Sequence, residues 1–298
     1  MQGAILKSFT FENNGGNGAG VIFLDKQITN DKKQEIAAHI GLSETAFILQ
    51  IDSENYDVSF FTPVCEVELC GHATIAAFYY LGVIGIIKGS KEIKKVYQHT
   101  KAGKLAIEIV FNDNVEYVLM QQQTPKIYNE LLNQDLQKIA NSLNIFKNNI
   151  GLMDYEIYPT IVSTGLKDIM VPVKSRDILN SLNVNFDLIN EVSVENDVVG
   201  YHVYTVENGQ IFARNFAPRV GINEECATGT SNGALCSLLY KKGIVLNEVS
   251  VIQGESMNEK SSVYVKLVEI GGLIDVWVGG KSSVLNKINI GEEGPYEN

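Results

Sequence analysis

Two cysteines stand directly before runs of small residues, a placement that can serve proton chemistry. Cys70 opens CGHATIAAFYYLG and Cys226 opens CATGTSNGALCSLLYKKG, and both runs are predicted to be buried helices. The first amides of a helix have no partner within the helix and carry about half a positive charge. Each helix start is therefore expected to bind an anion such as a carboxylate.

The same positive field acts on the thiols. A cysteine at a helix start has its pKa lowered from about 8.5 toward 7, so both thiols are expected to be partly ionised at neutral pH. A thiolate on one side of a carbon and a thiol on the other can remove a proton from one face and return it to the opposite face. Racemisation or epimerisation of an amino acid by Cys70 and Cys226 is one mechanism that the sequence leaves open.

The two halves of the chain repeat one pattern. Pro63 of SFFTP comes seven residues before Cys70, and Pro218 of RNFAP comes eight residues before Cys226. A strand, a turn and a thiol at a helix start thus occur twice, which indicates a duplication. If the halves are related by a pseudo-twofold axis, the two helix starts can face each other across one cleft.

Most of the remaining chain has the alternating pattern of strands, which indicates an α+β fold with few helices. Further helices are predicted over residues 129–143 and 175–190, and over DKKQEIAAHIGL, where Gly41 is placed to end the helix. The polar segment 121–125 is the best candidate for a linker. We therefore expect an N-terminal domain over residues 1–122 and a C-terminal domain over 123–298, with the last residues able to return to the first.

Composition excludes several classes of function. The formal charge is 24 − 35 = −11 and the isoelectric point is about 4.9, so the basic surface of a nucleic-acid-binding protein is not expected. No apolar run is long enough for a membrane span, and MQGAILKSFTFENN lacks the layout of a signal peptide. We expect a cytoplasmic protein whose four cysteines are thiols.

Five ordered motifs carry a family resemblance. They are GNGAGVIFLD, GLSETAFIL, FFTPVCEVELCGHATIAA, VSTGLKDIMVPV and FAPRVGINEECATGTSNGAL, and they span the chain. The sequence resembles the PhzF-like phenazine biosynthesis family of isomerases. That resemblance implies the diaminopimelate epimerase-like fold, in which two pseudo-symmetric domains each wrap a mixed, mostly antiparallel sheet around a central helix. It also implies an active site between the domains, no cofactor, no metal, and a homodimer.

The resemblance assigns roles to particular residues. Glu44 of LSET matches the family's proton-shuttling glutamate, His72 matches its glycine-histidine pair, and Glu225 matches the acid ahead of its alanine-threonine-glycine run. Asn17 falls in the glycine-asparagine element. Where the family usually has aspartate and proline, this chain has Glu225 and Cys226, so it holds both the glutamate of the isomerases and the cysteine pair of the related racemases.

The resulting hypothesis is a cofactor-independent isomerase that acts on a small carboxylate substrate. Glu44 moves the proton, His72 and Glu225 assist, and substrate contacts come from Asn17, Gly71, Ala73, Thr228, Gly229 and Thr230. The two-cysteine racemase is the alternative, and a non-catalytic small-molecule-binding protein is the third option. Zinc is disfavoured because Cys236 lies nearly three helical turns from Cys226, about 15 Å along a helix.

Overall fold

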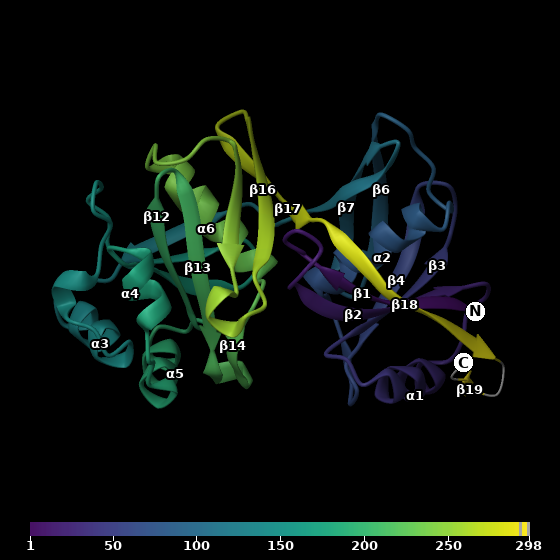
Figure 1. Ribbon diagram of the computed structural model, residues 1–298, viewed down its shortest axis with the longest axis horizontal. Coiled ribbons are helices and arrows are strands. Elements are labelled where there is room, and N and C mark those ends of the chain that lie inside the picture. Colours follow the sequence, from purple (N-terminus) through teal and green to yellow (C-terminus); the bar gives the residue numbers. More distant parts are fainter. Residues whose placement is uncertain (292–293, 297–298) are drawn as a thin grey trace. The chain divides into compact units, whose positions relative to one another are not determined.

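Residues 1–291 and 294–296 are described by a computed structural model, and Figure 1 labels many of its elements. The chain divides into two units. Unit 1 comprises Met1–Gln121 and the segment from Gly279 onward, and unit 2 comprises Gln122–Val278. Each unit has its own central helix, α2 (Gly71–Val83) in unit 1 and α6 (Gly229–Lys241) in unit 2.

Unit 1 is built mostly from strands. Its helices are α1 (Asn30–Ile40) and α2 (Gly71–Val83). Its strands are β1 (Gln2–Ser8), β2 (Asn17–Leu24), β3 (Thr45–Gln50), β4 (Asn55–Phe61), β5 (Glu66–Val67), β6 (Ile93–Thr100), β7 (Gly103–Asn112), β8 (Asn114–Gln121), β18 (Ser282–Gly291) and β19 (Gly294–Tyr296). The late strand β18 pairs antiparallel with β1, so the end of the chain belongs to this unit's sheet.

Unit 2 has the same kind of sheet and more helices. Its helices are α3 (Gln134–Ser142), η1 (Lys147–Asn149), α4 (Arg176–Ser181), α5 (Phe186–Glu195), η2 (Pro218–Val220), α6 (Gly229–Lys241) and η3 (Glu255–Met257). Its strands are β9 (Lys126–Glu130), β10 (Thr160–Ser163), β11 (Lys167–Pro172), β12 (Tyr201–Glu207), β13 (Gln210–Ala217), β14 (Ile222–Glu225), β15 (Glu248–Gln253), β16 (Ser261–Ile270) and most of β17 (Leu273–Gly280), which ends in unit 1.

The strand pairings show the duplication directly. In unit 1, β1–β2, β3–β4, β4–β5 and β6–β7 are antiparallel, whereas β2–β3 and β4–β6 are parallel. In unit 2, β10–β11, β12–β13, β13–β14 and β15–β16 are antiparallel, whereas β11–β12 and β13–β15 are parallel. The order is the same, and the SFFTP and RNFAP motifs end the equivalent strands β4 and β13.

Each sheet curves around its central helix. Helix α2 contacts β1, β2, β3, β7 and β8, and α6 contacts β10, β11, β12 and β16. Both helices are buried over most of their length, which requires small residues where strands approach closely. A Cβ on Gly233 of α6 would lie 2.8 Å from Val278 Cγ2, so the strand leaves no room for a side chain there. The α+β fold expected from the sequence is confirmed.

Local predictions were partly right. Gly41 ends α1 in the left-handed conformation, with φ 70°, and its N–H bonds to Ala37. The single helix predicted over 175–190 is wrong: it is α4 followed by α5, because Asn185 leaves the helical conformation and its side chain caps Leu188 N–H. The helix predicted over 129–143 begins only at Gln134, because residues up to Glu130 pair with β10.

Candidate active site

Glu44, Cys70 and His72 come together in unit 1. Glu44 directly precedes β3, Cys70 is the N-cap of α2, and His72 is the second residue of that helix. Glu44 Oε2 lies 3.0 Å from His72 Nε2, and Cys70 Sγ lies 3.5 Å from His72 Nδ1. The imidazole therefore contacts both groups that the sequence offered as alternative proton carriers.

The backbone around Glu44 is fixed by strand pairing. Gly20 N–H donates to the Glu44 carbonyl at 3.0 Å, and Gly20 pairs with Thr45 in the β2–β3 register. A Cβ on Gly20 would lie 2.7 Å from Thr45 Oγ1, so glycine allows this close approach. The pairing places Glu44 just before the start of β3, where its carboxylate contacts His72 of α2.

The start of α2 is tied to the same sheet. Ser8 Oγ donates to the His72 carbonyl at 2.9 Å. Ser8 pairs with Asn17 in the β1–β2 register. The predicted substrate-contact residue Asn17 therefore lies opposite the serine that bonds to the start of α2. Gly71 and Ala73 are the first and third residues of α2, in the turn where backbone N–H groups have no helical acceptor.

Electrostatics make Glu44 and His72 an ion pair. Burial raises the pKa of Glu44, but the neighbouring His72 outweighs it and holds the pKa below the ordinary 4.5. Burial likewise opposes a charge on His72, yet Cys70 and Glu44 hold its pKa well above 6.5. Glu44 is thus held in its ionised form next to an imidazole whose charged form is favoured.

We expect an NMR titration to show this coupling. The pKa of the His72 ring should lie well above the ordinary 6.5, and Glu44→Gln should lower that pKa because the neutral amide no longer stabilises the imidazolium. Glu35→Gln is the matched control, because Glu35 is an exposed residue of α1. Because the folded pKa of His72 is raised, its contribution to stability is full below about pH 6.5 and is lost as pH rises through the folded value. A His72 titration unchanged by Glu44→Gln would contradict the pairing.

These three residues form the one group in the described part of the chain that could hold a metal ion. The ligand atoms of Glu44, Cys70 and His72 lie within 4.8 Å of one another. Cys226 and Cys236, which were weighed as ligands from the sequence, are not in this group. Two features disfavour a cation here: the amide end of α2 is positive, and burial raises the pKa of the Cys70 thiol, which a metal would have to deprotonate.

Unit 2 places a second acid at its own helix start. Glu225 ends β14, Thr228 is the N-cap of α6, and Gly229 and Thr230 are the first two residues of the helix. Thr228 Oγ1 donates to Glu225 Oε2 at 2.7 Å. The side chain of Glu225 is therefore held against the turn that leads into the helix, beside Cys226.

The expectation of acidic thiols is wrong for both cysteines. Burial raises the pKa of Cys70 and of Cys226 above the ordinary 9, and for Cys226 the nearby carboxylate of Glu225 raises it further. The side chains are only 8% and 7% exposed, so loss of solvation outweighs the positive field of the helix. Both are free thiols, as expected.

A third acid, Asp168, carries no signal in the sequence. This residue of β11 is 3% exposed, and its Oδ2 accepts a 2.5 Å hydrogen bond from Ser231 Oγ in the first turn of α6. Burial raises the pKa of Asp168 to about 6, although the hydrogen bonds from Ser231 and Gly200 favour the charged form. Asp168 therefore titrates close to neutral pH.

Asp168→Asn is expected to change how stability depends on pH. The pKa of Asp168 is raised from 3.8 to about 6, so charging this carboxyl destabilises the fold as pH rises through that window. Two pH units correspond to roughly 3 kcal/mol, and the uncharged amide of the variant would escape that loss. Urea unfolding at pH 4 and pH 8 measures the free energy of unfolding of parent and variant. The control is Asp187→Asn, because Asp187 is an exposed residue of α5. A difference between variant and parent that does not change with pH would contradict the assignment.

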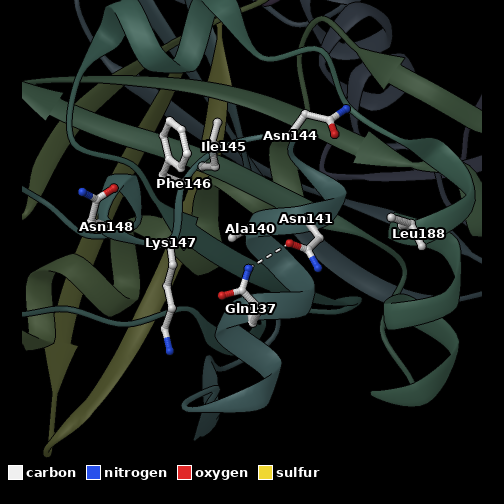
Figure 2. Close-up of a pocket in the computed structure, with 9 residues that line it drawn as sticks. All are labelled: Gln137, Ala140, Asn141, Asn144, Ile145, Phe146, Lys147, Asn148 and Leu188. Atoms are coloured by element: carbon white, nitrogen blue, oxygen red, sulfur yellow. Dashed lines mark hydrogen bonds between the residues drawn. The ribbon is translucent and has the colours of Figure 1, made fainter.

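An open pocket of about 840 Å³ lies elsewhere in unit 2 (Figure 2). It is formed by α3, the turn after it and one residue of α5, and the residues that line it include Gln137, Asn141, Phe146, Lys147 and Leu188. Gln137 Nε2 donates to Asn141 Oδ1 within this pocket, as Figure 2 shows. None of its lining residues is a predicted site residue, and it holds no acid–base pair.

Comparison with known proteins places this geometry in a family. The sequence profile described as phenazine biosynthesis-like protein, PhzC-PhzF, matches residues 6–287. The chain belongs to this family. An uncharacterized isomerase of Clostridium acetobutylicum is 34% identical over 294 residues, which cover 95% of each chain. The chain is thus grouped with enzymes of the isomerase type.

Solved structures agree on the fold. The PhzF family phenazine biosynthesis protein of Bacillus anthracis has a TM-score of 0.82 at 24% identity, covering 96% of this chain and 97% of that one. A probable proline racemase from Agrobacterium radiobacter has a TM-score of 0.63 at 12% identity, covering 98% and 93%. The Bacillus anthracis protein and the probable proline racemase therefore share the fold seen here. Among the described residues, no helix is long and apolar enough to span a membrane.

Proposed function

We propose that the protein isomerises a small carboxylate by acid–base proton transfer, with Glu44 as the proton shuttle. The observation that carries this proposal is the 3.0 Å ion pair between Glu44 and His72 at the start of α2. It provides an ionised base, a cation beside it and the first-turn amides of a helix in one place. Those are the components needed to form and stabilise a carbanion next to a carboxylate.

The proposed reaction returns the protein to its starting protonation state after each turnover. Glu44 removes a proton from a carbon of the substrate, and the electron pair left behind delocalises into an enolate-like or allylic anion. The charged His72 ring and the α2 amides stabilise that anion. Glu44 then returns the same proton to a different carbon, which completes an isomerisation or allylic shift and regenerates the carboxylate.

Other predicted residues have supporting parts in the proposal. Glu225 orients the substrate, and the amides of Gly71, Ala73, Gly229 and Thr230, with Thr228 and Asn17, bind its carboxylate. The substrate would lie in a cleft to which both helix starts contribute. The proposal includes a cytoplasmic homodimer that works without a cofactor, a metal, a nucleic acid or a membrane.

Proton exchange with D2O tests the reaction type. A panel of small carboxylates, including cyclic hydroxy-amino acids and both enantiomers of proline, would be incubated with the enzyme in D2O and followed by ¹H NMR. The proposal predicts a new isomer that retains part of the original hydrogen. Rapid, complete exchange of an α-hydrogen with inversion at that carbon would instead indicate two-base racemisation.

Racemisation by Cys70 and Cys226 is the second candidate, favoured by the contact between Cys70 and His72. Cys226→Ser separates the two. The glutamate mechanism predicts turnover within about tenfold of the parent, because the substitution removes no proton carrier. A two-base mechanism predicts a loss of about 10³-fold, since one of its two acid–base groups is replaced.

A further inference from the structure

A chain of buried hydrogen bonds runs beneath the first turn of α6 and ends at Glu225. Its members come from β12, β13, β15 and α6, and they are Asn215, His202, Asn232, Gln253 and Thr228. Asn215 is 3% exposed, and His202, Asn232 and Gln253 are fully buried. Together these polar groups form a network whose hydrogen bonds all lie within unit 2.

The backbone determines which way the Gln253 amide points. Thr228 N–H donates to Gln253 Oε1 at 3.2 Å, and Gln253 Nε2 donates to the Glu225 carbonyl at 2.7 Å. With the Gln253 amide reversed, its NH2 group would face the Thr228 N–H and its oxygen would face the Glu225 carbonyl. Gln253 Nε2 therefore also donates to Thr228 Oγ1, at 3.1 Å. The Thr228 hydroxyl accepts that bond and directs its own proton to Glu225 Oε2.

The rest of the chain supports this orientation. Asn232 Nδ2 donates to the Thr228 carbonyl and to Gln253 Oε1, so Asn232 Oδ1 faces His202 Nε2 and accepts from it. On the other side of the ring, Asn215 Nδ2 donates to His202 Nδ1. His202 must then carry its proton on Nε2. Burial lowers the pKa of His202 to about 4, so the ring stays neutral at physiological pH.

The side-chain donors that link Asn215 to Thr228 in this chain of hydrogen bonds each point one step closer to Glu225. We propose that Gln253 is a positioning residue for Glu225: it commits the Thr228 hydroxyl to donate, and so keeps the Glu225 carboxylate as a fixed, ionised acceptor. This rests on the proposed function in one respect, that Glu225 acts on the substrate. Glu225 then serves as the permanent anion of the site, and Glu44 is the group that changes protonation state.

Unit 1 contains a glutamine that can be compared with Gln253. Gln98 of β6 occupies the place of Gln253, and Thr74 in the first turn of α2 occupies the place of Asn232. There Thr74 Oγ1 donates to Gln98 Oε1 at 3.2 Å, and Gln98 Nε2 donates to Met120 Sδ at 3.5 Å. A buried glutamine under the helix start is thus common to both units. The hydrogen bonds that orient an acid are found on Gln253.

A carboxyl titration tests the proposal without a substrate. ¹³C NMR would follow the Glu225 carboxyl, assigned by its loss in Glu225→Gln, in the parent, Thr228→Ser, Thr228→Val and Gln253→Met. Thr228→Ser keeps the hydroxyl and should titrate like the parent. Thr228→Val and Gln253→Met should titrate about one pH unit higher, because hydrogen bonds to the charged form favour it. If Gln253→Met does not fold, the matched Thr228 pair decides the question.

Two results would overturn the proposal. One is a Glu225 titration in folded Thr228→Val that equals that of Thr228→Ser. The other is a ¹⁵N spectrum in which His202 carries its proton on Nδ1 between pH 5 and 8. For a compound that the enzyme converts, Thr228→Val should lower kcat/KM about tenfold, with Thr228→Ser restoring it. Full activity in Glu44→Gln would refute the proposed function and leave the titration result standing.

Discussion

Glu44→Gln is expected to lower turnover by about 10³-fold while leaving the fold intact. The amide is nearly isosteric with the carboxylate, but it cannot accept a proton, and a positioned general base contributes about 10²–10⁴-fold. Glu44 is partly exposed, with 22% of its side chain accessible, and His72 can release its proton once the carboxylate is replaced, so the fold should survive the substitution. Turnover of a compound found in the D2O panel, measured at saturation, gives the value.

The matched control is Glu35→Gln, since Glu35 is exposed on α1 and pairs with Lys32. That variant should keep parental activity. Glu44→Asp shortens the side chain while keeping the carboxylate, so it should lose less activity than Glu44→Gln. Parental turnover in Glu44→Gln would remove Glu44 from the chemistry, whatever its position.

Arg214→Met is expected to give the largest loss of stability among simple substitutions near the site. Arg214 is 7% exposed, and it forms a two-pronged ion pair with Glu224, at 2.8 and 2.9 Å. It also donates to the carbonyls of Leu179 and Leu182, each at 3.1 Å. Removing one partner of a buried pair costs about 3–5 kcal/mol, because the other charge stays unpaired.

A loss of that size lowers the melting temperature of a unit this long by roughly 10 °C, which calorimetry detects. The double variant Arg214→Met/Glu224→Gln should recover part of the loss, since no charge is then left unpaired. Glu224 adjoins Glu225 on β14, so the single variant should also weaken the site. A loss below about 1 kcal/mol would show that the pair does not hold β14 in place.

The sequence could predict what is local in the chain. The thiols, the small-residue runs and the SFFTP and RNFAP motifs identified both helix starts, and the LSET and GHAT motifs identified Glu44 and His72. The structure adds that Glu44 and His72 are in contact, which depends on the parallel pairing of β2 with β3 and hence on residues far apart in sequence.

What the sequence could not show is the buried polar network. Asp168, His202 and Gln253 stand in strands that look like other strands, and only the folded sheet brings them beneath α6. The sequence also could not predict the pKa values of the two thiols, because two opposing effects act on them. The helix field lowers the pKa of a thiol and burial raises it, and the burial of Cys70 and Cys226 is a property of the fold.

A crystal structure of the Glu44→Gln variant with a compound that the parent converts would show whether Glu44 faces the reacting atoms. We expect the reacting carbon within about 3.5 Å of the amide that replaces the Glu44 carboxylate, and the carboxylate of the compound against first-turn amides of α2 or α6. A compound bound in the pocket of Figure 2, or one whose reacting carbon faces Cys70 or Cys226 while the substituted side chain turns away, would contradict the proposed role of Glu44.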